Sequence, residues 1–336
     1  MKRLYIIGNE KINLSNGNFF SANIDFKTII EGLSFNFNLH VLARGSNNKQ
    51  TFNIVHKNII LSTNILIYLI NTILTFRIKK SIYLIISITP YTFLSFLILS
   101  IFKKNIFLYL RSDGYKEYEA ILGKKWVFLY RIMFLFMTKN VKIISCHKSL
   151  SRGKPFFFVK PSELSDLWLT SRTKNVPKIN INFLYVGRIR IEKGIFSLLD
   201  IFNQLDDRFN LTIIGDREIN TRNYKNLSFF YFFNSIRDLI FQYDKCHIFV
   251  LPSYTEAHPK VIDEALSRLK PVIIFDDIAH VIENRIGVFK TKRNVQDFID
   301  LVENIKKNYN EVVRKIYSNN LPTKKKFIQD LIKIIK

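Results

Sequence analysis

Two glutamates between apolar, strand-like segments are the strongest candidates for chemistry in this sequence. Glu256 and Glu264 form E-x(7)-E within S-Y-T-E-A-H-P-K-V-I-D-E-A-L-S, with Pro259 between them. Because a carboxylate accepts several hydrogen bonds, one on a loop and one in the following helix could hold the hydroxyls of a sugar nucleotide. Ordinary first-turn charge at a helix start explains the same pair without a ligand. Spacing alone does not separate the two interpretations.

A second group of candidates lies upstream, in F-L-Y-V-G-R-I-R-I-E-K-G. We expect a strand to end at Gly187 and to be followed by Arg188 and Lys193 in the loop before a helix. A glycine lets the backbone approach a ligand, and cations at the carboxyl end of a parallel strand suit a diphosphate. A solvated, charged turn remains the alternative interpretation of these residues.

Further candidates for donor binding follow two other expected strands. L-T-I-I-G-D ends in Gly215 and Asp216, and Ser253 follows the strand C-H-I-F-V-L. The sequence contains no G-x-G, no P-loop pattern and no D-x-D pair. The last absence counts against metal-dependent transferases that hold a nucleotide diphosphate through aspartates. We expect no metal and no cofactor.

Alternating strands and helices are expected to position these residues, which predicts an α/β fold with parallel, doubly wound sheets. The first strand is expected to end at Gly8. Other expected strands are 38–42, 82–88, 106–110, 141–145, 156–159, 182–186, 211–214, 227–230, 246–251 and 272–275. Expected helices are 20–33, 91–101, 124–138, 194–205, 235–242, 261–269 and 294–308.

The domain organisation follows from a polar interruption of this alternation. A chain of 336 residues is long enough for two domains. We expect an N-terminal domain at 1–165, a linker within 161–177 and a second domain at 178–320. The amphipathic segment 321–336 is expected to be a helix that could pack back on the N-terminal domain.

The net charge of +24 and the pI near 9.9 are compatible with nucleic acid, an anionic membrane or an anionic substrate as partner. Residue bias is a fourth explanation, because the lysines are scattered. No helix shows a concentrated basic face, which argues against nucleic acid. Cys146 and Cys246 are expected to be buried free thiols.

Two uncharged stretches, 58–76 and 81–102, are long enough to cross a bilayer. Pro90 stands in the middle of the second one. A buried strand, a turn and a helix that starts with Pro90 explain that stretch better than a membrane span.

Together, G-R-I-R-I-E-K-G, I-I-G-D and P-S-Y-T-E-A-H-P-K-V-I-D-E-A-L-S-R-L-K-P-V-I resemble the C-terminal half of glycosyltransferase family 4, the group 1 glycosyl transferases. The resemblance covers about 182–288. It implies the GT-B fold, with two Rossmann-like domains facing a central cleft. It also implies a retaining, metal-independent transferase that uses a nucleotide diphosphate sugar.

By position, the resemblance implies that Arg188 and Lys193 bind the diphosphate. Glu264 would bind the ribose, and Glu256 the donor sugar near the reacting carbon. Glu256, Arg188 and Lys193 are therefore the expected catalytic residues. Arg217 stands near Gly215 where the family usually has a second glycine.

The resemblance also suggests contacts in the N-terminal half. Gly17 lies where the family has a glycine loop, and Arg111 and Asp113 of R-S-D-G occupy the place of a family histidine. These three residues are candidates for contact with the acceptor or the donor sugar.

The expected function is transfer of a sugar to a glycan or lipid-linked acceptor in bacterial surface polysaccharide biosynthesis, such as that of lipopolysaccharide, capsule or O-antigen. The enzyme is expected in the cytoplasm, docked on the inner face of the cell membrane, with no nucleic-acid partner. The alternatives are a basic nucleic-acid-binding protein and a membrane-spanning protein, both without transferase activity.

Overall fold

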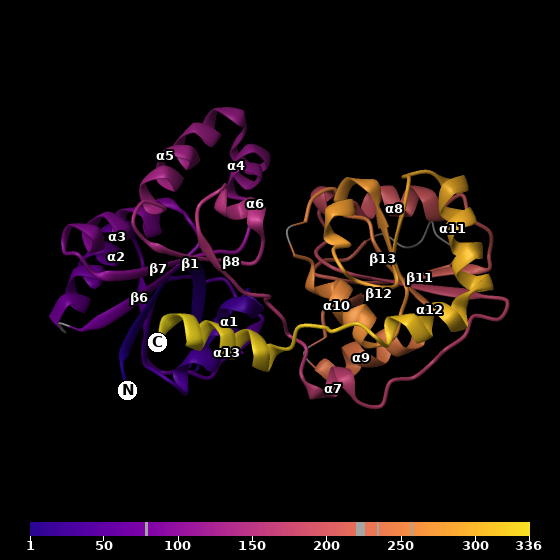
Figure 1. The fold of residues 1–336 in the computed structure, drawn as a ribbon, viewed down its shortest axis with the longest axis horizontal. Helices are drawn as coiled ribbons and strands as arrows, with labels where there is room; N and C mark the ends of the chain where they lie inside the picture. The colour runs from indigo at the N-terminus through magenta and orange to yellow at the C-terminus, as the bar shows by residue number, and fades with distance from the viewer. Residues whose placement is uncertain (78–79, 220–225, 234, 257) are drawn as a thin grey trace. The chain divides into compact units, whose positions relative to one another are not determined.

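The chain forms two compact units, and the first unit combines both ends of the sequence (Figure 1). The structure is a computed structural model that describes residues 1–77, 80–219, 226–233, 235–256 and 258–336. Unit 1 consists of Met1–Glu163 and Lys324–Lys336, and unit 2 of Leu164–Thr323. Each unit has a largely parallel sheet with helices on both faces, so the predicted α/β class with two Rossmann-like domains is confirmed.

The sheet of unit 1 is parallel except at its second strand, which pairs with the first and with the fourth, both antiparallel. Its strands are β1 Arg3–Ser15, β2 Asn18–Ser21, β3 Asn38–Gly45, β4 Phe52–Ile54, β5 Ile59–Ser62, β6 Ser81–Ile86, β7 Asn105–Leu110, β8 Lys142–Ser145 and β9 Phe156–Phe158. Strand β1 pairs in parallel with both β3 and β6, and the sheet continues through β7 and β8 to β9. The carboxyl ends of these parallel strands therefore meet along one edge.

Helices cover both faces of this sheet (Figure 1). They are α1 Ile24–Ser34, α2 Ile65–Leu74, α3 Pro90–Ile101, α4 Gly114–Leu122, α5 Val127–Met137, α6 Lys148–Ser151 and α13 Lys324–Ile335, with 3₁₀ turns at Thr75–Arg77 and Lys124–Trp126. Helices α1 and α13 share one hydrophobic core with the sheet, and α2, α3 and α5 share the other. The last helix of the chain therefore completes the core of the first unit.

The expectation that the first strand ends at Gly8 is wrong. Strand β1 continues to Ser15 and turns back into β2. The turn residues Asn16 and Gly17 both have positive φ, at 50° and 75°. Such backbone angles suit a two-residue hairpin turn, and Asn-Gly is its most favoured sequence. The helix expected from residue 20 begins only at Ile24, because Asn23 caps it by accepting the N–H groups of Asp25 and Phe26.

The two apolar stretches are strand–helix pairs. Residues 58–76 form β5 and α2, and residues 81–102 form β6 and α3. Pro90 is the first residue of α3, as predicted, and Thr89 caps the helix in a capping box with Thr92. Within the described residues, no helix has the length and apolar character needed to span a bilayer.

Unit 2 is built on a fully parallel sheet in the order β12-β11-β10-β13-β14-β15. The strands are β10 Ile181–Val186, β11 Phe209–Gly215, β12 Leu227–Tyr231, β13 Ile248–Leu251, β14 Val272–Phe275 and β15 Val288–Thr291. The helices are α7 Asp166–Leu169, α8 Ile195–Phe202, α9 Ile236–Lys245, α10 Lys260–Ser267, α11 Val295–Lys307 and α12 Tyr309–Ile316, with 3₁₀ segments at Ile191–Lys193 and Asp276–Val281. The chain order reverses between β10 and β13, and ligands bind at such points in open α/β sheets.

Part of the expected linker is packed structure. Leu164 and Trp168 are buried in the core of unit 2, and the ring of Trp168 meets that of Tyr243 edge-on at 5.3 Å. The polar residues around 161–177 suggested a linker, but the two apolar side chains pack part of this segment into unit 2.

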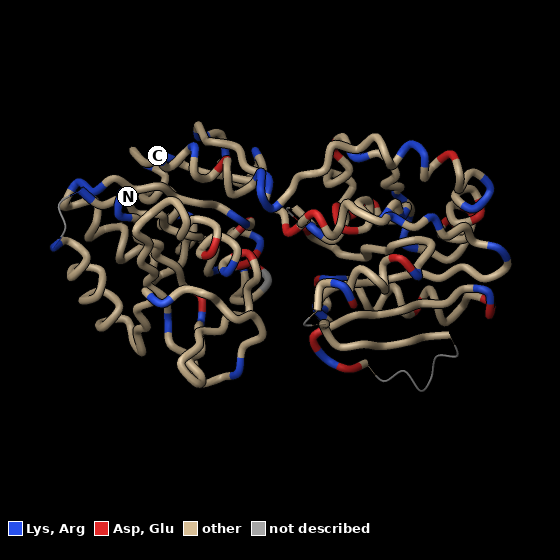
Figure 2. The backbone as a smooth tube through the Cα atoms, turned by 90° about the horizontal axis from the view of Figure 1, so that it is seen from below, with Lys and Arg blue, Asp and Glu red and all other residues tan. Residues whose placement is uncertain are grey.

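Cys146 and Cys246 are both buried and form no disulfide, as expected. Figure 2 shows Lys and Arg along both units, with few acidic positions in unit 1.

Candidate functional site

Lys193, Ser253 and Glu256 form a polar cluster at the carboxyl edge of the unit 2 sheet. The Lys193 ammonium group lies 2.6 Å from Glu256 Oε1, and the Ser253 hydroxyl group donates to the same oxygen at 2.7 Å. The side chains of Lys193 and Glu256 are only 20% and 12% exposed, and Ser253 is fully buried. A partly buried cation and carboxylate thus follow the neighbouring strands β10 and β13.

Backbone contacts hold together the two loops that carry this cluster. The N–H group of Tyr254 donates to the Glu192 carbonyl oxygen at 3.0 Å. Gly194 has a φ of 66°, and a Cβ atom at this position would overlap the Pro252 carbonyl oxygen. Only glycine allows this close approach without strain. The loop after β13 and the loop after β10 are therefore fixed against each other.

Two side chains that follow β14 and β15 also hold the Glu256 loop. The His280 imidazole Nε2 lies 2.8 Å from the Glu256 carbonyl oxygen. The Arg293 guanidinium group lies 4.1 Å from the centre of the Tyr254 ring and 2.7 Å from Asp277 Oδ2. Sequence reasoning found neither role, because both residues lie more than 20 positions from Glu256 and carry no motif.

Asp216, which follows β11, contacts the loop after β10 that carries Gly187 and Arg188. Its Oδ1 accepts the Ile189 N–H at 2.8 Å, and its Oδ2 lies 3.5 Å from Arg190. Asp216 therefore holds the loop after β10 in place. Gly187 donates from its N–H to the Ile214 carbonyl oxygen at 3.0 Å. Arg188 is exposed. Sequence analysis passed over Arg190, which alternates with Arg188 in R-I-R.

Gly215 ends strand β11 beside this loop. A Cβ atom at Gly215 would lie 2.8 Å from the Ile189 side chain. The space that the glycine leaves is therefore filled by the same loop that carries Arg188. Arg217, which stands where the resemblance would place a glycine, is exposed.

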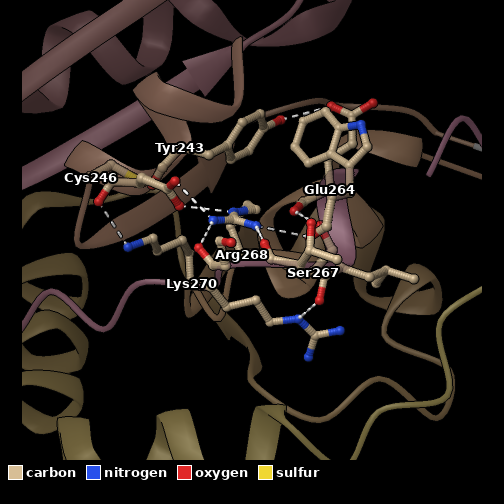
Figure 3. A network of polar contacts seen from close by, with 12 residues as sticks. Tyr243, Cys246, Glu264, Ser267, Arg268 and Lys270 are labelled. Carbon is tan, nitrogen blue, oxygen red and sulfur yellow. Dashed lines mark hydrogen bonds and ion pairs between the residues drawn. The ribbon is translucent and has the colours of Figure 1, made fainter. Parts of the chain in front are cut away.

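Glu264 lies in the middle of α10, and its carboxylate has a buried partner (Figure 3). The hydroxyl group of Tyr243, from α9, donates to Glu264 Oε2 at 2.9 Å. Burial raises the pKa of Tyr243 well above its usual value, so the hydroxyl group stays protonated and acts as a donor. Pro259 is the cap residue directly before α10. Tyr243 thus fixes one oxygen of the carboxylate.

A buried cation stabilises the end of the same helix (Figure 3). Arg268 is 1% exposed and binds Asp244 through two nitrogens, at 2.8 and 2.9 Å. It also donates to the carbonyl oxygens of Trp168, Thr170 and Ser171, at 3.1, 2.7 and 2.8 Å. These bonds satisfy the buried guanidinium group, which would be costly to bury otherwise. They tie α9 and α10, and so Tyr243 and Glu264, to the segment that enters unit 2.

In unit 1, Arg111 belongs to a polar group that sequence analysis found only in part. The Arg111 guanidinium group lies 2.8 Å from Glu10 Oε1, and Asn23 donates to the same oxygen at 2.8 Å. Glu10 follows the part of β1 that pairs with β6, and Arg111 follows β7. Both therefore lie at the carboxyl edge of the sheet, and this position is the signal by which Glu10 could have been found.

The other two candidates in unit 1 have local structural positions. Asp113 caps α4 by accepting the Tyr115 N–H at 3.1 Å, and Arg152 lies 3.6 Å from its carboxylate. Gly17 lies in the turn of the β1–β2 hairpin, with no atom near the position of a Cβ. The structure joins Arg111 to Glu10, whereas Gly17 serves the hairpin turn. Within the described part of the chain, no group of three His, Cys, Asp or Glu side chains is arranged to hold a metal ion.

Comparisons with known proteins agree with this architecture. Residues 170–321 match the family model described as glycosyl transferases group 1. The chain is 27% identical over 284 residues to "Uncharacterized glycosyltransferase MJ1059" from Methanocaldococcus jannaschii, a match that spans 68% of this chain and 69% of that protein.

Solved structures show the same fold over the whole chain. WaaG, a glycosyltransferase involved in lipopolysaccharide biosynthesis, aligns with a TM-score of 0.69 at 14% identity, covering 99% of each chain. Anabaena Alr3699/HepE in complex with UDP and glucose aligns with a TM-score of 0.64 at 12% identity, covering 100% of this chain and 95% of that one. The fold is GT-B. With the family match over residues 170–321, which lie within unit 2, the chain is similar to the group 1 glycosyl transferases, and glycosyltransferase is the enzyme class that the comparisons support.

Proposed function

We propose that this glycosyltransferase is retaining and metal-independent, and that it takes its sugar from a nucleotide diphosphate donor. The observation that carries the proposal is the cluster of Lys193, Ser253 and Glu256 at the carboxyl edge of the unit 2 sheet. The HepE structure, which binds UDP and glucose, supports a donor of this chemical class.

The cluster suggests how the departing diphosphate is stabilised. Lys193 and the exposed Arg188 supply positive charge where the leaving group gains negative charge. One preorganised group of this kind contributes about 2.7–4 kcal/mol to lowering a barrier. A diphosphate that attracts Lys193 also releases Glu256 Oε1, which then accepts a hydroxyl group of the donor sugar. Ser253 keeps the carboxylate oriented during this exchange.

Glu264 is proposed to bind the ribose. Tyr243 holds Oε2 in place, and because a carboxylate accepts several hydrogen bonds, a ribose hydroxyl group could be a further donor to Glu264. Gly187, Gly215 and Asp216 would shape the loop that receives the diphosphate, since Asp216 braces the Ile189 backbone.

The acceptor is proposed to be a glycan or a lipid-linked glycan, and the setting is bacterial surface polysaccharide biosynthesis at the cytoplasmic face of the membrane. The similarity to WaaG, a protein of lipopolysaccharide biosynthesis, supports this setting. Arg111 and Asp113 of unit 1 remain the proposed acceptor or sugar contacts. Gly17 is proposed in the same role on the family resemblance alone.

The test replaces Glu264 by Ala and by Gln and measures release of nucleotide diphosphate from the donor. We expect Glu264→Ala to abolish turnover and Glu264→Gln to retain part of it, with melting temperatures close to that of the wild type. Unchanged turnover in Glu264→Ala would refute the assignment. Full activity in EDTA and an unchanged anomeric configuration of the product by NMR are the results expected for a metal-independent, retaining enzyme.

A further inference from the structure

Helix α2 turns its apolar side chains toward solvent. Leu66, Ile70 and Ile73 are 69%, 55% and 49% exposed, whereas the buried residues of the helix are Tyr68 and Thr72. A surface helix of a water-soluble protein normally shows the opposite arrangement, with its apolar stripe toward the core. The exposed side of α2 therefore does not serve the core of unit 1.

The buried side of α2 explains why the helix keeps this orientation. The Tyr68 hydroxyl group donates to the Gly8 carbonyl oxygen at 2.8 Å, and Thr72 Oγ1 lies 3.1 Å from Ser95 Oγ on α3. Rotating α2 to bury its apolar side chains would break these hydrogen bonds of Tyr68 and Thr72, and buried polar groups are normally hydrogen-bonded. The outward position of the Leu and Ile side chains is thus built into the fold.

Helix α5 repeats this exposure in the same layer. Phe128, Leu135 and Phe136 are 69%, 53% and 57% exposed. Helix α3 lies between α2 and α5 in the layer, and its Phe93 ring lies 6.3 Å from that of Phe136. We call the side chains that α2 and α5 expose the outer apolar face, defined as Leu66, Ile70, Ile73, Phe128, Leu135 and Phe136.

Cations outnumber anions in the sequence around the outer apolar face, and the acidic residues there include the exposed Glu117 and Glu119 of α4, the helix that packs beside α5. Residues 32–112 contain no Asp or Glu, and neither does α5. Lys103 follows the end of α3, and Lys124 and Lys125 precede α5, all three exposed. An apolar surface with a basic border is complementary to an anionic lipid surface. A second copy of the chain would bring the same cations together and would be repelled.

The lengths of the helices determine how a membrane could be contacted. Helices α2, α3 and α5 have 10, 12 and 11 residues. At about 1.5 Å per residue they reach about 15–18 Å, roughly half of the hydrocarbon thickness of a bilayer. Such helices can lie in the interface of one leaflet but cannot cross the membrane.

We propose that the outer apolar face docks unit 1 on an anionic lipid surface, with its aromatic and aliphatic side chains among the acyl chains and the bordering lysines at the headgroups. This proposal rests on the proposed function, because docking would bring the enzyme to a lipid-linked acceptor. Its test measures lipid binding and not turnover, so docking and transfer can fail separately.

The experiment is co-sedimentation of the full chain with phosphatidylcholine vesicles, with and without 30% phosphatidylglycerol. We expect at least tenfold tighter binding to the anionic vesicles. Ile70→Gln with Phe128→Gln removes apolar contacts from two helices, and Gln keeps helix propensity. This pair should weaken binding at least tenfold. The second pair, Lys124→Gln with Lys125→Gln, changes residues that lie outside the hydrophobic cores. It should weaken vesicle binding by about tenfold or more.

The matched control is Ile236→Gln with Phe241→Gln on α9 of unit 2, whose side chains are 38% and 54% exposed. It should bind as the wild type does. Four results would each overturn the proposal: no sedimentation with anionic vesicles, equal binding to neutral ones, full binding by both test pairs, or equal loss in the control. A dimer in light scattering that Ile70→Gln with Phe128→Gln converts to a monomer would also overturn it, in favour of a second copy of the chain.

Discussion

The two units share one architecture but differ in what their helices expose. In unit 2, α11 buries Phe298, Val302 and Ile305 and turns charged residues to solvent. In unit 1, α2 buries Tyr68 and Thr72 and exposes aliphatic side chains. The family match covers unit 2 alone. Two units with the same fold can thus have different functions. We expect unit 2 to bind the donor at the carboxyl edge of its sheet and unit 1 to dock on lipid through its layer of α2, α3 and α5.

The largest effect is expected from the polar cluster of unit 2. Lys193→Met removes the ammonium group 2.6 Å from Glu256 and keeps the aliphatic stem. We expect kcat to fall about 10²–10³-fold, as for loss of one preorganised charge-stabilising donor. The rate at which nucleotide diphosphate is released from the donor measures kcat. The control Lys290→Met removes a lysine that is 59% exposed and lies 3.4 Å from Asp276, and its kcat should stay unchanged. Equal losses in the two variants would remove Lys193 from the site.

Next in size is the effect of the C-terminal helix on unit 1. Leu331 is fully buried, and α13 packs in one core with α1. Leu331→Ala should destabilise unit 1 by about 2–5 kcal/mol, because it leaves a cavity. Hydrogen exchange read by mass spectrometry should show faster opening in 1–163 and none of this change in 164–323. The exposed neighbour Lys333 gives the control Lys333→Ala. Faster opening confined to unit 2 would contradict the assignment of α13.

The stability of unit 2 is expected to depend on pH through the buried residue His247. His247 accepts the Asn182 N–H at 2.9 Å through Nδ1, and burial, with a contribution from Lys270, lowers its pKa from 6.5 to about 4. The unfolded chain binds this proton first, so the stabilising contribution is complete above pH 6.5 and is lost as the pH falls toward 4. Between pH 7 and pH 5 we expect a loss of about 2 kcal/mol.

Urea denaturation at both pH values, followed by a probe within unit 2, measures this loss. His247→Asn keeps an acceptor near the Asn182 N–H but does not titrate. Its stability should change less between pH 7 and pH 5 than that of the wild type. The same slope in both proteins would show that other groups cause the effect.

The smallest effect is expected from the partner of Glu264. Tyr243→Phe keeps the buried ring but removes the hydrogen bond to Oε2. We expect KM for the donor to rise about tenfold, as for loss of one hydrogen bond to a charged group, while kcat stays within about twofold. Tyr309→Phe removes a buried hydrogen bond to the His247 carbonyl oxygen in the same unit and serves as the control. If both variants raise KM equally, Tyr243 has only a structural role.

Local patterns predicted the parts of the fold that depend on neighbouring residues. Pro90 marked the start of α3, and the α/β class and GT-B fold followed from alternating strands and family motifs. The β1–β2 hairpin was missed, although Asn16 and Gly17 form a favoured turn, because Gly8 was interpreted as the end of the strand. Strand β15 and helix α12 were missed as well.

The candidate site also divides into residues that sequence motifs predicted and residues that they missed. Lys193 and Glu256, 63 residues apart, were both predicted from family motifs, and the structure brings them together. Tyr243, Arg293 and Glu10 were missed, since each meets its partner through tertiary packing that no short motif encodes. Glu10 and Arg111 are 101 residues apart. The outward side of α2 was also unforeseen, because an all-apolar segment does not reveal which side is buried.

The central claim is that unit 2 binds a nucleotide diphosphate sugar through Lys193. The most direct measurement is the melting temperature of the full chain with a panel of such donors carrying uracil, guanine, adenine or thymine bases. A donor at about 100 times its Kd stabilises the native state by about 2.7 kcal/mol. We predict that at least one donor raises the wild-type melting temperature by about 5 °C or more and that Lys193→Met loses most of this rise. No shift with any donor, or an equal shift in both proteins, would contradict the claim.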